Sequence, residues 1–142
     1  MKNFACVDRR WQQVKIKERD SPIILLLEEI EETRDCIKKL LERDGYRIQE
    51  SRNEDSAIES ARRTPPDLIL VCIEGLINDI VAVGRRIRTR AELSDDTAVV
   101  VFRCETINEN EKVSVEDDIY VISPNNFNQL RQFLNRLLQQ RL

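Results

Sequence analysis

The chain contains no histidine, and this absence removes several kinds of site at once. Catalytic pairs in which a histidine activates a serine or a cysteine are excluded in their usual form. A zinc site would need all four thiolates, from Cys6, Cys36, Cys72 and Cys104, and these are widely spaced with no CxxC pair. We therefore interpret the cysteines as reduced structural residues.

Long apolar runs are also missing. No stretch approaches the roughly 18 residues that span a bilayer, and the first 20 residues are too polar for a signal peptide. A cytoplasmic protein is expected. Strong charge of one sign is lacking too, because the formal net charge is only -3. This gives no general attraction for nucleic acid or for a membrane surface, so we expect protein or small-ion partners.

The composition is that of a folded chain. Glycine and proline are scarce, with three and four residues, while 41% of the residues are hydrophobic. Fibrous and wholly disordered classes are therefore excluded. A length of 142 residues fits one domain with its own core.

Short aliphatic runs predict the strands. Residues 22–27, which begin with Pro22, and residues 68–72, which follow Pro65-Pro66-Asp67, are unbroken apolar runs. Such runs are typical of strands buried on both faces of a parallel sheet. Residues 97–102 and 119–122 are similar. Residues 46–50 are more polar and suit the edge of a sheet.

Apolar residues at helical spacing predict helices over residues 31–44, 53–64, 80–91 and 127–138. Asn53 is expected to cap the second of these helices and Gly45 to end the first. Residues 104–118 hold few apolar side chains, so a weakly anchored helix or a short loop is expected there. The arginines of the third helix are predicted to face solvent; they are Arg85, Arg86, Arg88 and Arg90.

This alternation predicts an α/β protein with the flavodoxin-like (βα)5 fold. Right-handed crossovers place helices on both faces of a five-stranded parallel sheet of order 2-1-3-4-5, a three-layer sandwich. The domain covers residues 22–142, and residues 1–21 are interpreted as a mobile or loosely docked extension. Ligands of such sheets bind beyond the carboxyl ends of the strands, where Glu28, Glu29 and Cys72 fall.

Four strings in this framework resemble the receiver domains of two-component response regulators. They are ILLLEE at residues 24–29, LLERDGY at 40–46, AIESA at 57–61 and PDLILV at 66–71. The resemblance implies a site that takes a phosphoryl group from a histidine kinase onto an aspartate after the third strand. It also implies Mg2+ held by that aspartate and an acidic pair, with a hydroxyl residue and a lysine gripping the phosphoryl group.

This sequence departs from that pattern at three functional positions. The acidic pair corresponds to Glu28 and Glu29, but the phosphoacceptor position holds Cys72. The hydroxyl position holds Arg103 and the lysine position holds Ser123. A thiol cannot form an acyl phosphate and is a poor ligand for a hard cation, so we predict a degenerate phosphorylation pocket with weak or no Mg2+ binding and no other cofactor.

The resemblance to receiver domains also extends in part to the surface through which these domains signal, the switch face. The aromatic switch position corresponds to Tyr120, and the proline that follows the lysine position is kept as Pro124. The resemblance thus predicts a non-enzymatic pseudo-receiver in a two-component or phosphorelay pathway. It would act through protein partners, with a homodimer as one arrangement, and would bind neither nucleic acid nor membrane.

Two alternatives and one hypothesis about the pocket accompany this prediction. Another acid, Glu74 or Asp79, could accept the phosphoryl group. A thiol redox sensor could use Cys72 and Cys104. Within the leading prediction, Arg103 is hypothesised to form a bidentate pair with one carboxylate of Glu28 and Glu29, because neighbouring carboxylates without a cation repel each other.

Overall fold

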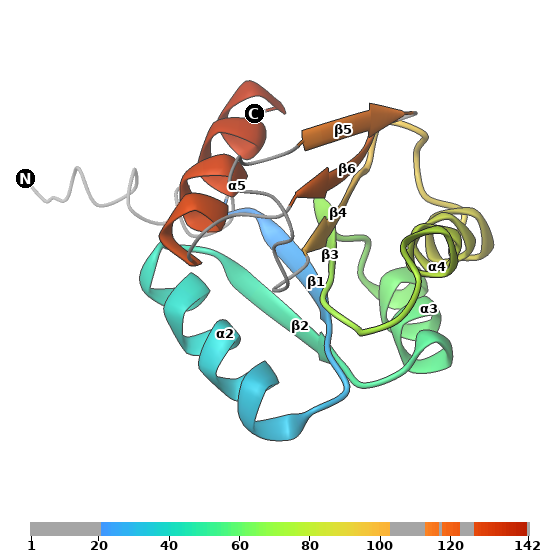
Figure 1. Ribbon diagram of the computed structural model, residues 1–142, viewed down its shortest axis with the longest axis horizontal. Helices are drawn as coiled ribbons and strands as arrows, with labels where there is room; N and C mark the ends of the chain where they lie inside the picture. Colours follow the sequence, from blue (N-terminus) through green and yellow to red (C-terminus); the bar gives the residue numbers. More distant parts are fainter. Residues whose placement is uncertain (1–20, 103–112, 117, 123–126, 142) are drawn as a thin grey trace, which may run out of the picture.

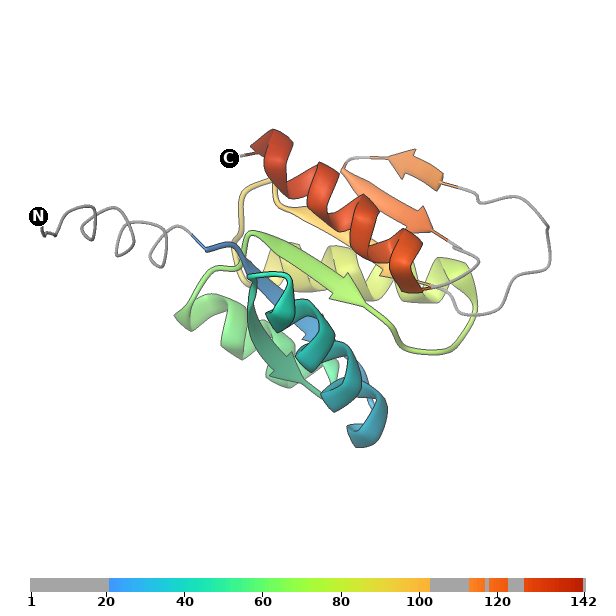
Figure 2. The same ribbon diagram turned by 90° about the vertical axis from the view of Figure 1, so that its left-hand side faces the viewer.

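The computed structural model describes residues 21–102, 113–116, 118–122 and 127–141, and it has one six-stranded sheet between two layers of helices (Figures 1 and 2). Along the chain the elements are β1 (Ile23–Leu27), α2 (Glu31–Arg43), β2 (Arg47–Ser51), α3 (Glu54–Arg63), β3 (Leu68–Val71), α4 (Ile77–Arg90), β4 (Ala98–Phe102), β5 (Val113–Glu116), β6 (Ile119–Ile122) and α5 (Phe127–Arg141). The sheet order is β2-β1-β3-β4-β6-β5.

The five predicted strands are all present and parallel, in the predicted order 2-1-3-4-5. Helices α2 and α5 cover one face, and α3 and α4 cover the other (Figure 1). Successive residues of β1 therefore alternate between the two cores: Leu26 packs with the α2 and α5 side, and Leu25 with the α3 and α4 side. Burial on both faces is why these strands read as unbroken aliphatic runs.

Strand β5 is an addition to the predicted sheet. It pairs antiparallel with β6 in a hairpin, Val113 opposite Ile122 and Glu116 opposite Ile119. Neither a weak helix nor a short loop, the two structures expected for residues 104–118, describes residues 113–116. The alternation of Val113 and Val115 with polar residues has the two-residue period of a strand, and that signal is short enough to be overlooked.

The helix ends follow the chemistry of the sequence. The Asn53 side chain accepts a hydrogen bond from the Ser56 amide at 2.8 Å, as predicted for the cap of α3. Helix α2 is followed by Gly45, whose φ of +100° is costly for residues with a side chain.

One arginine of α4 is not on the solvent side, so that part of the prediction is wrong. Arg85, Arg86 and Arg90 are exposed, but Arg88 is buried. Its guanidinium donates a hydrogen bond to the carbonyl oxygen of Thr97 at 3.1 Å, which ties this arginine to the loop that leads into β4. Among the exposed arginines, Arg86 forms a bidentate ion pair with Glu54, 2.6 Å from Nε to Oε2, which links α4 to α3.

A second bidentate pair ties α5 to the end of α2. Arg131 donates to both carboxylate oxygens of Asp44, at 2.8 and 2.6 Å. The hydrogen bonds from Arg131 lower the pKa of Asp44 below its ordinary value. Protonation of Asp44 must therefore weaken the folded state relative to the unfolded chain.

We expect Asp44→Asn to lower the melting temperature at pH 7, and the deficit to shrink as the pH falls. The depressed pKa contributes stability above the unfolded value of about 3.9, and this is lost as the pH falls through the folded value. Thermal unfolding of both proteins between neutral and strongly acidic pH measures the difference. Asp35→Asn is the control, since its pair with Lys39 is exposed and should matter little. A deficit that persists unchanged in acid would contradict the assignment.

Candidate functional site

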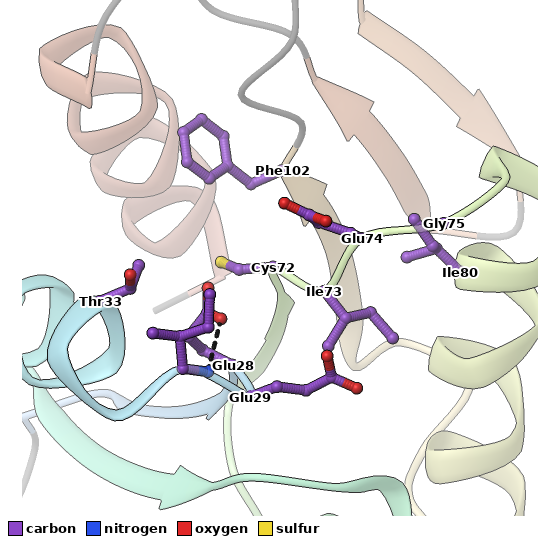
Figure 3. Close-up of a pocket in the computed structure, with 10 residues that line it drawn as sticks. Glu28, Glu29, Thr33, Cys72, Ile73, Glu74, Gly75, Ile80 and Phe102 are labelled. Atoms are coloured by element: carbon purple, nitrogen blue, oxygen red, sulfur yellow. Dashed lines mark hydrogen bonds between the residues drawn. The ribbon is translucent and has the colours of Figure 1, made fainter.

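A cavity of about 250 Å3 opens where the strands end at their carboxyl side (Figure 3). It lies beyond β1 and β3, where two crossovers leave for opposite faces of the sheet and where open α/β sheets bind ligands. Its lining consists of Glu28, Glu29, Ile30, Thr33, Cys72, Ile73, Glu74, Gly75, Ile80 and Phe102.

Backbone hydrogen bonds fix two of the sequence-predicted residues side by side at this mouth. The Cys72 amide donates to the Leu27 carbonyl oxygen at 2.9 Å, and the Glu28 amide donates to Ser51 at 3.1 Å. These bonds continue the parallel pairing of β1 with its two neighbours by one residue. The first residues after β1 and β3 are thus held by the sheet itself.

The two glutamates of the acidic pair lie in different environments. Glu28 is 6% exposed, and its Oε2 accepts a hydrogen bond from the Ile30 amide at 3.0 Å (Figure 3). Its carbonyl oxygen accepts from Arg34 at 2.8 Å. Glu29 is exposed, and its side chain extends toward Ile73 and away from Cys72. The pocket therefore has one buried carboxylate near the thiol and a second at its rim.

Cys72 is half-buried and packs against the core on the α2 and α5 side. Glu74, one of the alternative acids, lines the same pocket and extends toward Phe102 (Figure 3). Asp79 lies in the first turn of α4 and does not line this pocket. Of the two alternative acceptors, only Glu74 shares the cavity with Glu28.

Thr33 and Phe102 are among the lining residues that sequence reasoning did not place at the site. Thr33 stands in the first turn of α2, which starts right after the acidic pair. Phe102 is the last residue of β4, so it reaches the same edge of the sheet as Cys72. Its ring also packs edge-on against Phe127, with ring centres 6.0 Å apart, which connects the pocket wall to α5.

The remaining predicted positions are either elsewhere or undescribed. Arg103, Cys104, Ser123 and Pro124 lie outside the residues that the structure describes. Tyr120 is on β6 and half-buried, and it does not line the pocket. Its ring packs edge-on against Phe133 of α5, with centres 5.5 Å apart, and its hydroxyl lies 3.4 Å from Asp118 Oδ1.

The donor set fits Mg2+ poorly. This cation prefers oxygen ligands in near-octahedral order, whereas the residue held beside Glu28 is a thiol, and the other two lining carboxylates, Glu29 and Glu74, are exposed. One oxygen of Glu28 is already bonded to the Ile30 amide. In the part of the chain that the structure covers, no three acidic, cysteine or histidine side chains form a group able to hold a metal ion.

No helix among the described residues has the length and apolar character to cross a bilayer.

Comparisons with known proteins identify solved structures that share this fold. No protein-family model matches the chain, and no curated protein matches its sequence. Among solved structures it is similar to the response regulator TrrA of Thermotoga maritima in complex with Mg2+ and BeF, with 22% identity, a TM-score of 0.61, and coverage of 82% of this chain and 98% of that one.

Two further structures give the same result. One is the N-terminal domain of a response regulator/sensory box/GGDEF three-domain protein from Carboxydothermus hydrogenoformans, with 23% identity, a TM-score of 0.61, and coverage of 84% and 95%. The other is TrrA in complex with histidine kinase ThkA, with 20% identity, a TM-score of 0.63, and coverage of 82% and 98%. At these identities the likeness shows the fold, which is that of CheY-like receiver domains.

Proposed function

We propose that this chain is a receiver-like module of a two-component or phosphorelay pathway that signals through protein contacts and carries no acyl phosphate. One observation carries the proposal: the residue after β3, held beside buried Glu28, is Cys72 and not a carboxylate. In a receiver fold, the phosphoryl group would be attached to the residue at this position. A thiol there leaves the pocket with the shape of such a site but without its acceptor.

The presence of Cys72 in place of a carboxylate also affects metal binding. Without a carboxylate at residue 72, Mg2+ would have to rely on Glu28, Glu29 and Glu74, and these carboxylates differ in burial and direction. We therefore propose that the module needs no metal or other cofactor and catalyses no reaction. Its conformation would be set by packing and by whatever partner it binds.

The partner in this proposal is a protein. A structural neighbour, TrrA, has been solved in complex with the histidine kinase ThkA, so the fold supports contacts of this kind. On this chain we place the contact surface at β4, β6 and α5. Tyr120 and Phe133 pack together there and join β6 to α5. A partner that binds one of these two elements would therefore also affect the position of the other.

Incubation with acetyl phosphate and Mg2+, followed by intact-mass measurement, tests the proposal. We expect the mass of the chain to stay unchanged, because the residue beside Glu28 at the acceptor position is Cys72 and has no carboxylate. A stable adduct of one phosphoryl group would contradict the proposal. Glu74→Gln serves as the matched variant: an adduct that forms on the wild type and disappears in this variant would identify Glu74 as the acceptor and make the chain a working receiver.

A further inference from the structure

The pocket of Figure 3 contains a buried carboxylate that has no counter-charge among the described residues. Glu28 is 6% exposed, and while its Oε2 is bonded to the Ile30 amide, its Oε1 accepts no hydrogen bond within that part of the chain. The guanidinium of Arg34 is directed elsewhere, to the Glu28 carbonyl oxygen and, at 3.5 Å, to Glu50. Glu28 Oε1 is not one of the fully buried atoms that lack a hydrogen-bond partner, so this oxygen is accessible, and a cation that enters the pocket can bind it.

The rim strengthens this preference. Glu29 and Glu74 are both exposed and add two carboxylates to the lining, and the lining residues that the structure describes include no lysine or arginine. Anions are therefore repelled and cations attracted.

The walls favour a cation with an apolar stem over a bare metal ion. The remaining lining is largely hydrophobic, and it includes Ile30, Ile73, Ile80 and Phe102. Phe102 offers an aromatic ring against which a guanidinium can pack. An arginine side chain combines such a stem with a weakly hydrated cation that can bond two carboxylate oxygens at once.

We propose that this pocket receives an arginine side chain from a protein partner, with the guanidinium bound by Glu28 Oε1 and assisted by Glu74. The pocket volume of about 250 Å3 leaves room for one such side chain. The inference rests on the proposed function, because a phosphoryl group in the pocket would occupy the space that the arginine side chain needs. It adds the chemistry by which the partner is recognised.

Amide NMR of the full chain tests the inference at low salt. The probes are a capped Ala-Arg-Ala tripeptide and the same peptide with citrulline, which is neutral and of nearly the same shape. We expect the arginine peptide to give saturable shifts at the amides of Ile30 and Gly75, and the citrulline peptide to bind at least about tenfold more weakly.

Glu28→Gln is expected to weaken binding of the arginine peptide by a similar factor. The carboxamide keeps an oxygen that can accept from the Ile30 amide, so this variant should fold, which unchanged shifts far from the pocket would verify. Glu42→Gln is the matched control: Glu42 is exposed in the last turn of α2, outside the pocket, and its loss should leave binding unchanged.

Two results would overturn the inference. Equal binding of the arginine and citrulline peptides would show that charge is not recognised. Binding that appears only after Arg103→Gln would show that the chain's own guanidinium occupies the pocket. Both results are measured as amide chemical shifts of the unphosphorylated chain. Failure of the proposed function would instead be measured as an increase in mass with acetyl phosphate. The two failures are therefore distinguishable.

Discussion

Cys72→Asp is expected to make the stability of the chain depend on Mg2+. The new carboxylate would stand beside buried Glu28, anchored by the same hydrogen bond from the residue-72 amide to Leu27. Without a cation, two neighbouring carboxylates repel each other, so the apo variant should be less stable than the wild type. With a cation, the variant offers the oxygen ligands that the thiol could not supply.

The magnitude follows from linkage. If Mg2+ is present at about 100 times its dissociation constant for the variant, binding to the folded state alone adds about 2.7 kcal/mol. Thermal unfolding with and without Mg2+ measures this gain. Cys72→Asn is the matched control, because it has nearly the same shape without the charge. Equal Mg2+ responses in the two variants would show that residue 72 does not share a cation site with Glu28.

Gly84→Ala is expected to destabilise the fold by about 1–3 kcal/mol, although alanine is the better helix former. Gly84 is where α4 packs closely onto the sheet, and a β-carbon there would lie 2.5 Å from Val99 Cγ1. Val99 is fully buried in a central strand, and a β-branched side chain has few alternative rotamers. The clash therefore cannot be relieved by a simple side-chain rotation.

A double-mutant cycle in urea identifies the cause of that loss. Val99→Ala removes the clashing methyl groups, so Gly84→Ala should cost much less in the Val99→Ala background than in the wild type. A cost that is the same in both backgrounds would place the strain elsewhere. Ala82→Gly, on the same helix, is a control for helix propensity and should lower stability by about 1 kcal/mol or less.

Much of the fold could be predicted because its signals are local or depend on simple burial. The aliphatic runs of β1 and β3 have no polar face, and only a sheet covered on both sides can bury them. Asn53 is placed by its own hydrogen bond to the backbone three residues later. Crossover handedness then reduces the possible strand orders to few, and the flavodoxin-like order was confirmed.

The features that escaped prediction depend on contacts distant in sequence or on very short patterns. Buried Arg88 donates a hydrogen bond to the Thr97 carbonyl oxygen, a partner that no helical periodicity reveals. Strand β5 alternates valine with Ser114 and Glu116 over four residues, and it lacks the unbroken aliphatic run that identified β3. In the pocket, the position of Glu28 beside Cys72 follows from strand order, but the different directions of Glu28 and Glu29 depend on the Ile30 amide.

The most direct test of the account is a Mg2+ titration of the wild-type chain, followed at the Ile30 amide. That amide donates to Glu28 Oε2, so a metal ion that binds Glu28 must change its chemical shift. We expect no saturable shift at sub-millimolar Mg2+, because Cys72 supplies no oxygen ligand to complete the site. A saturable sub-millimolar shift at Ile30, matched at the Cys72 amide, would show a working cation site and contradict the account.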